Sequence, residues 1–166
     1  MENNQDIYGL SRWGSGLLQV LENGNLGLVA PNQPEFKPVD IMRIVHDLNQ
    51  RGITAPVLLR IVDFLYHRIS QINEAFSTAI RENDYKGRYQ GVFPITVNQQ
   101  AQVIDRIVDH GQRYDFGLEV GSKAELLIAL SHELTSQAAI ICNGVKDEEF
   151  IQLALMSQRL GFHFSR

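Results

Sequence analysis

Apolar and polar positions near the start of the chain predict a hairpin followed by a helix. Short apolar runs at 16–21 and 26–30 are separated by a polar stretch containing Asn23-Gly24. Asn-Gly readily adopts the positive φ angles of a tight turn, so these runs are expected to pair as antiparallel strands. Apolar residues three and four apart then predict a helix over 41–48, and the apolar run 57–61, which follows a proline, predicts a strand.

From residue 63 the pattern becomes a regular alternation of helices and strands, at roughly 25 residues per pair. Apolar spacings predict helices around 65–80 and 103–111, and strands are predicted at 89–97, 116–120, 139–143 and from 162. A capping-box spacing at Ser122 predicts the start of a third helix, and acidic residues at 147–149 predict the start of a fourth, which Gly161 ends. Such an order favours right-handed crossovers and a parallel sheet. The order alone fits either a piece of a barrel or a small open sheet.

The helix expected after residue 122 has a clear start signal in the sequence. Ser122 stands three residues before Glu125, the spacing of a capping box, in which the serine caps the helix and the glutamate reaches back.

The change of pattern near residue 62 divides the chain into two expected parts, 1–62 and 63–166.

Composition narrows the class of protein. The 166 residues are 44% hydrophobic and 20% charged, which is enough apolar material for a core. The net charge is −4 and no run of Lys or Arg is present, so nucleic acid and anionic membranes are poor partners. No stretch approaches the ~18 apolar residues of a membrane span. The polar start, 1–6, and the single Cys142 predict a cytoplasmic protein without an internal disulfide.

Five segments, in the same order and register, resemble biosynthetic arginine decarboxylase of the long bacterial and plant type. They are YGLSRWG at 8–14, YKGRYQGVFPI at 85–95, VNQQ at 97–100, GLEVGSKAEL at 117–126 and ICNGVKD at 141–147. The resemblance implies a fold-type III enzyme, in which a (β/α)8 TIM-type barrel is joined to a β-domain built from both ends of the chain. The hairpin and the run 57–61 would belong to the β-domain, and residues after 63 would begin a partial barrel.

The same resemblance implies a function. Family members convert L-arginine to agmatine and CO2 for polyamine synthesis, with pyridoxal phosphate and commonly Mg²⁺. They are oligomers with active sites at subunit interfaces, and they are several times longer than this chain. The groups that hold the pyridine nitrogen and the phosphate of the cofactor come from later strands in that family.

Thr96 is the main departure from the family pattern. In the family, the strand that ends VFPI is followed by a lysine whose amine holds the cofactor as a Schiff base, and here that position is Thr96. A hydroxyl forms no imine, so Thr96 is interpreted as a lost catalytic residue. The alternative is an ordinary β-branched residue of a strand.

Other candidate residues each have a functional and a structural interpretation. Glu119, near the end of a predicted strand, is placed near the cofactor by the resemblance, and a purely structural role is equally open. Asn98 could line the same site, although a helix N-cap is the favoured interpretation. For Ser122, a helix cap is the favoured interpretation, and a ligand of the cofactor phosphate is the alternative. Lys123 and Lys146 could supply a substitute amine, but solvated loop lysines are favoured.

No metal site is predicted, because the five histidines show no ligand spacing. Cys142 is interpreted as a core residue. Three functions remain open: a segment of an arginine decarboxylase that is inactive alone, a non-catalytic subunit that binds a full-length relative, and a degraded reading frame. The expected partners are L-arginine, by resemblance, and further subunits in a homo- or hetero-oligomer.

Overall fold

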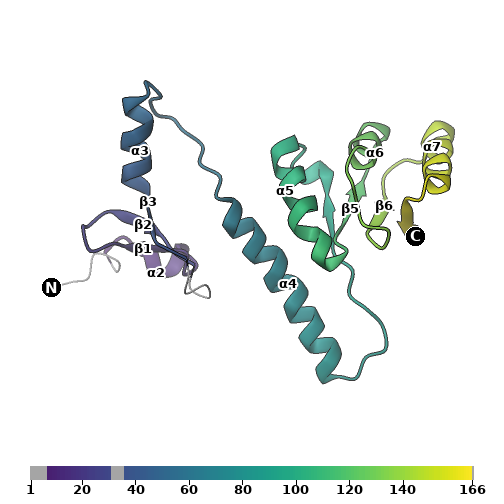
Figure 1. Ribbon diagram of the computed structural model, residues 1–166, viewed down its shortest axis with the longest axis horizontal. Helices are drawn as coiled ribbons and strands as arrows, with labels where there is room; N and C mark the ends of the chain where they lie inside the picture. The colour runs from purple at the N-terminus through teal and green to yellow at the C-terminus, as the bar shows by residue number, and fades with distance from the viewer. Residues whose placement is uncertain (1–6, 31–35, 166) are drawn as a thin grey trace. The chain divides into compact units, whose positions relative to one another are not determined.

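The computed structural model describes residues 7–30 and 36–165. The chain divides into two compact units, one up to Arg60 and one from Ile61 onward. Each unit has a sheet of its own, antiparallel in the first and parallel in the second. The units are therefore described separately (Figure 1).

A small antiparallel sheet forms the first unit, together with the short helix α2 (Leu10–Trp13). Its strands, in spatial order, are β1 (Leu18–Val20), β2 (Leu26–Leu28) and β3 (Val39–Asp40). The predicted hairpin is confirmed, since β1 pairs with β2 and the turn places Gly24 at φ 83°. That φ lies in the left-handed region that glycine enters without steric cost.

Helix α3 (Ile41–Gln50) confirms the helix predicted over 41–48, and Asp40 explains where it begins. One carboxylate oxygen of Asp40 accepts hydrogen bonds from two backbone N–H groups of the first turn, at 2.9 and 3.2 Å. The other oxygen accepts from the side-chain amides of Asn23 and Asn25, both at 2.9 Å. These bonds, first that from Asn25 and then that from Asn23, lower the pKa of Asp40.

The strand predicted over 57–61 is wrong. Residues 57–60 have no regular secondary structure, and helix α4 (Val62–Glu82) begins directly after Ile61. The apolar side chains of this stretch are exposed, with Leu58 at 72%. A strand forms only when a neighbour accepts and donates its backbone hydrogen bonds. No described strand pairs with this stretch, so its apolar composition alone does not produce one.

The second unit contains a parallel four-stranded sheet whose order follows the chain, β4-β5-β6-β7. Its strands are β4 (Val92–Pro94), β5 (Gly117–Val120), β6 (Ala139–Cys142) and β7 (His163–Ser165). The connecting helices are α5 (Ala101–Gly111), α6 (Lys123–Leu130) and α7 (Glu148–Arg159). The predicted α/β alternation and parallel pairing are confirmed. None of the described helices, the 21-residue α4 included, is apolar enough over a sufficient length to cross a bilayer.

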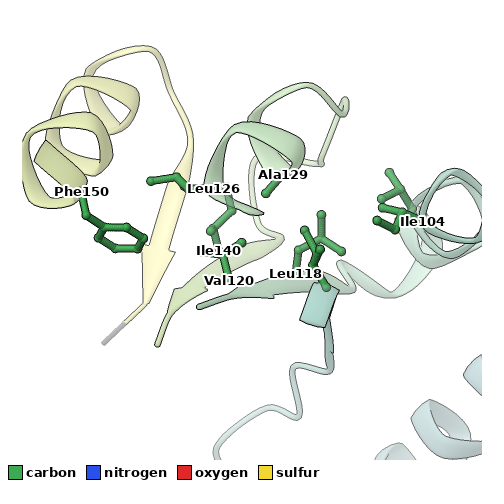
Figure 2. Packing of buried hydrophobic residues seen from close by; sticks show 9 residues of the cluster. Ile104, Leu118, Val120, Leu126, Ala129, Ile140 and Phe150 are labelled. Carbon is green, nitrogen blue, oxygen red and sulfur yellow. The ribbon is translucent and has the colours of Figure 1, made fainter. Parts of the chain in front are cut away.

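The core of this unit lies between the sheet and helices α5, α6 and α7 (Figure 2). Leu118, Val120 and Ile140 from the strands and Leu126 from α6 are all 0% exposed. Phe150, at the start of α7, is 2% exposed and is among the largest buried side chains described. Burial of such side chains contributes ~1.5–3 kcal/mol each, so this layer is the main source of stability in the unit.

The strand predicted over 89–97 is shorter than expected. β4 ends at Pro94, and residues Ile95–Val97 form a 3-10 turn. Proline has no N–H to donate to the ladder, which explains why strand pairing stops there. Thr96 therefore lies in a turn, and its interpretation as a β-branched strand residue is wrong.

Helix α4 packs on α5 through an aromatic pair. The rings of Tyr66 and His110 stack with centroids 4.3 Å apart, and the Ser70 hydroxyl lies 3.0 Å from Nε2 of His110. Burial, and then the neighbouring Arg113, lower the pKa of His110, while a hydrogen bond to the Tyr66 backbone and then the charge of Asp109 oppose the shift. The neutral imidazole is therefore the form that this helix pair favours.

Candidate functional site

The residues selected from the sequence converge on one edge of the parallel sheet. Parallel strands all end at the same edge, and this carboxyl edge is where α/β barrels build their sites. Thr96 follows β4, Glu119 is the third residue of β5, and Ser122 follows β5. Asn143, which was not a candidate, follows β6 at the same edge.

Thr96 is exposed in the 3-10 turn after β4. Its hydroxyl has no hydrogen-bond partner among the described residues. The side chain is thus free to meet a ligand at this edge, but its chemistry is limited to that of an alcohol. It cannot form the imine that an amine forms with an aldehyde.

Glu119 lies on the face of the sheet opposite the helices. Its neighbours Leu118 and Val120 both point into the core, and side chains alternate along a strand. The Asn143 amide donates a 2.6 Å hydrogen bond to Oε1 of Glu119. The Asn143 backbone N–H donates to the Val120 carbonyl at 2.8 Å. Asn143 therefore fixes Glu119 from the neighbouring strand, and a neutral amide, not a cation, is its partner.

The predicted cap at Ser122 is confirmed. Its hydroxyl oxygen accepts from the backbone N–H of Glu125 at 3.2 Å. Glu125 reaches back as expected, although its Oε2 accepts from the N–H of Gly121, at 2.6 Å, one residue earlier than in the standard capping box. One N–H of the first turn of α6, that of Glu125, is thus occupied by the Ser122 side chain, and the N–H of Gly121 just before the helix is occupied by Glu125.

Asn98 is not the N-cap of α5, so that prediction is wrong. The N-cap is Gln100, and Oδ1 of Asn98 accepts from the Gln100 N–H at 3.0 Å. The Asn98 side chain thus forms a turn with the backbone just before the helix. This turn uses the Oδ1 atom that capping would also use. Both arrangements use an asparagine near a helix start, which is why the sequence did not separate them.

A hydrogen bond between the loop before α5 and the first turn of α6 was missed by the sequence analysis. Nε2 of Gln99 donates to Oε1 of Glu125 at 3.2 Å, across a sequence separation of 26 residues. It links the segment that carries Thr96 to the start of α6. No local pattern signals a bond over such a separation, although both residues fall in segments that carry the family resemblance.

The two candidate substitute amines differ in their partners: carboxylates for Lys123 and a backbone carbonyl for Lys146. Nζ of Lys123 lies 2.6 Å from the Glu149 carboxylate and 2.9 Å from that of Asp147. These bonds, with that to Glu149 the larger, raise the pKa of Lys123 and keep it protonated. Nζ of Lys146 donates to the Gly144 carbonyl at 3.1 Å. An ammonium is not a nucleophile, so Lys123 in this arrangement is poorly suited to imine formation.

The described residues form no cluster of three His, Cys, Asp or Glu side chains that could hold a metal ion. Cys142 packs against the apolar core, as interpreted from the sequence. Burial raises the pKa of its thiol, which disfavours the reactive thiolate.

Comparison with known proteins finds one family over most of the second unit. The family model described as "Pyridoxal-dependent decarboxylase, pyridoxal binding domain" matches residues 69–163. The biosynthetic arginine decarboxylase of Prochlorococcus marinus subsp. pastoris is 40% identical over 163 residues, 98% of this chain and 25% of that protein. The biosynthetic arginine decarboxylase of Geotalea daltonii is 43% identical over 162 residues, with the same coverage.

A solved structure agrees with these sequence matches. The crystal structure of the biosynthetic arginine decarboxylase from Campylobacter jejuni superposes with a TM-score of 0.83 at 33% identity, covering 95% of this chain and 26% of that one. The chain thus spans about a quarter of the length of the relatives it matches. Because the family model covers more than half of its residues, the chain belongs to the pyridoxal-dependent decarboxylases, through their pyridoxal-binding domain.

Proposed function

We propose that this chain is the amino-terminal part of an arginine decarboxylase-type protein that does not hold pyridoxal phosphate covalently and does not decarboxylate arginine by itself. The relatives are named biosynthetic arginine decarboxylases, which supports conversion of L-arginine to agmatine and CO2 as the ancestral reaction. A cytoplasmic location and a role related to polyamine synthesis belong to the same proposal.

The observation that carries this proposal is the threonine at position 96, on the carboxyl edge where the resemblance places an amine. Thr96 occupies the position at which the resemblance places the cofactor lysine, and its exposed hydroxyl cannot form an imine. Lys123 is held as an ammonium by Glu149 and Asp147. The residues present therefore do not fit a covalently held pyridoxal group. The described residues form no cluster of three His, Cys, Asp or Glu side chains, so Mg²⁺ enters this proposal through the family resemblance alone.

The experiment is borohydride reduction of the chain with pyridoxal phosphate, followed by peptide mapping and an assay for agmatine. We expect no stoichiometric adduct and no agmatine. The Thr96→Lys variant is the matched test of the remaining site, because it restores the amine and changes nothing else. We expect this variant to produce no agmatine either. A stoichiometric adduct on Lys123 or Lys146 together with agmatine would show that a displaced lysine serves the reaction, and the proposal would be wrong.

A second function, as a non-catalytic subunit, is favoured by the edges of the parallel sheet. Among the described strands, β4 and β7 each pair along one side only. Unpaired strand edges present backbone groups that another strand can bind. Co-purification with a full-length arginine decarboxylase relative at micromolar concentration tests this function. A mixed oligomer is the expected result, and its absence argues against a subunit role.

A further inference from the structure

Glu125 carries a buried carboxylate, and the residue is 7% exposed. Each of its two oxygens accepts a hydrogen bond from a different segment of the chain. Oε2 accepts from the Gly121 N–H at 2.6 Å, and Oε1 accepts from Nε2 of Gln99 at 3.2 Å. A buried carboxylate needs such donors, because an unsatisfied charge away from water is strongly unfavourable. Gln99 is thus the side-chain donor of a charge-assisted hydrogen bond.

The segment around Thr96 is otherwise held by the side chain of Ile95, which is 0% exposed in the core, and by local hydrogen bonds. The Asn98 N–H donates to the Ile95 carbonyl at 3.1 Å, and Oδ1 of Asn98 accepts from Gln100 at 3.0 Å. Both bonds stay within the turn. Among the described residues, the Gln99–Glu125 bond is the side-chain hydrogen bond that joins residues 96–99 to the first turn of α6.

We propose that Gln99 is a positioning residue, which fixes the turn carrying Thr96 against the Glu125 carboxylate and so sets where the side chain at position 96 meets a ligand. The significance of position 96 rests on the proposed function, but the Gln99–Glu125 hydrogen bond rests on geometry alone. Gln99 touches no reacting group. It acts through the backbone of the turn, three residues from Thr96.

The test measures amide hydrogen exchange of Asn98 and its neighbours in the full chain. Gln99→Glu keeps the shape of the side chain but replaces the donor by a second carboxylate that repels Glu125. At neutral pH we expect local exchange at 96–98 to become about tenfold faster, in line with the loss of one hydrogen bond to a charged group. Gln100→Glu is the matched control, because the Gln100 side chain caps nothing and makes no bond to Glu125.

A double variant exchanges the carboxylate and the amide between positions 99 and 125. In the double variant Gln99→Glu with Glu125→Gln, the new amide at 125 can donate to the new carboxylate at 99 and still accept from the Gly121 N–H. Exchange at 96–98 should return to within about twofold of the original, a coupling that a double-mutant cycle isolates. In the single variant Gln99→Glu, exchange at 96–98 should also return toward that of the original chain in acid, because protonation of one carboxyl removes the repulsion. The two chains are compared at the same pH.

Three results would overturn the inference. They are unchanged exchange in Gln99→Glu, failure of the double variant to recover, and acceleration that is equal across the whole second unit. The last would show a global loss of stability and no positioning of the turn. None of these measurements uses pyridoxal phosphate, so a lysine adduct that defeats the proposed function would leave this test unaffected, and the reverse also holds.

Discussion

The two units of this chain are organised by different forces. In the first unit, the half-buried carboxylate of Asp40 accepts hydrogen bonds from the side-chain amides of Asn23 and Asn25 and from the start of α3. In the second, apolar side chains from strands and helices form a continuous buried layer around Leu118 and Ile140. The comparison teaches that regular elements can be specified locally by turns and caps, whereas a sheet with long connections depends on burial.

Burial is unevenly divided between them. In the described part of the first unit, the buried apolar side chains are Leu10 and Leu28, and α3 buries none of its residues. In the second unit, β5, β6, α5 and α6 each place fully buried side chains in the core. The largest differences between the units should therefore come from core substitutions.

Truncating Phe150 should give the largest effect. Phe150→Ala removes a ring that is 2% exposed, and such changes cost about 3–5 kcal/mol. Leu28→Ala is the counterpart in the first unit, where a side chain beside a three-stranded sheet should cost about 2 kcal/mol. Urea unfolding followed by hydrogen exchange reports both. If Leu28→Ala proved as costly as Phe150→Ala, the contrast in burial would not govern stability.

Substitutions at two glycines distinguish the cost of backbone strain from the cost of steric overlap with a neighbour. Gly144 has φ +69°, and a Cβ there would meet the Gly121 carbonyl oxygen at 2.4 Å. Gly24 has φ +83°, but a Cβ there would meet nothing within 4 Å. Gly24→Ala should therefore cost about 1 kcal/mol from strain alone, and Gly144→Ala at least about 2 kcal/mol more. Equal losses in thermal unfolding would mean that the loops after β5 and β6 separate easily.

Asp40 tests whether the first unit depends on polar contacts. Asp40→Ala should destabilise α3 and the hairpin together, because one carboxylate serves both, and Asp40→Asn should retain part of the effect. The pKa of Asp40 is lowered in the folded chain, so its contribution is present above the ordinary carboxyl pKa and is lost as the pH falls through the lower folded value. Helix content and hairpin exchange, measured from neutral to strongly acidic pH, would check this. Loss of one element without the other would separate them.

His110 should give a smaller effect with a different pH range. Its pKa is lowered in the folded chain, so the unfolded chain binds the proton first as the pH falls. The α4–α5 contact should therefore be fully stable above the ordinary histidine pKa of about 6.5, and should weaken as the pH falls from there to the lower folded pKa. Hydrogen exchange of α4 across this range would report it. His110→Gln should abolish the dependence, and a persistent slope in that variant would assign it to another group.

The sequence predicted the elements whose signals are local. The Asn23-Gly24 turn, the Ser122 cap and the apolar spacing of α5 each depend on residues a few positions apart. The run 57–61 failed because strand formation needs a partner, which composition does not supply. The turn at Thr96 was missed because the β-branched residues after Pro94, the last residue of β4, continue the strand-like composition without a break.

The candidate site was predictable in its location but not in its contacts. Alternation of helices and strands was sufficient to bring Thr96, Glu119 and Ser122 to one edge. The Gln99–Glu125 and Asn143–Glu119 bonds join residues 24 or more positions apart, and their distances depend on strand register and loop conformation. Neither quantity can be obtained from one sequence by periodicity.

The exposure of Thr96 has an evolutionary consequence. The side chain at this position contributes no hydrogen bond to the described structure and lies outside the buried layer. Its replacement therefore carries almost no folding penalty, so selection for a stable fold does not protect the identity of the residue. Only selection for chemistry can do so. A lineage that no longer needed the reaction could lose its reactive amine by neutral drift and keep the architecture intact.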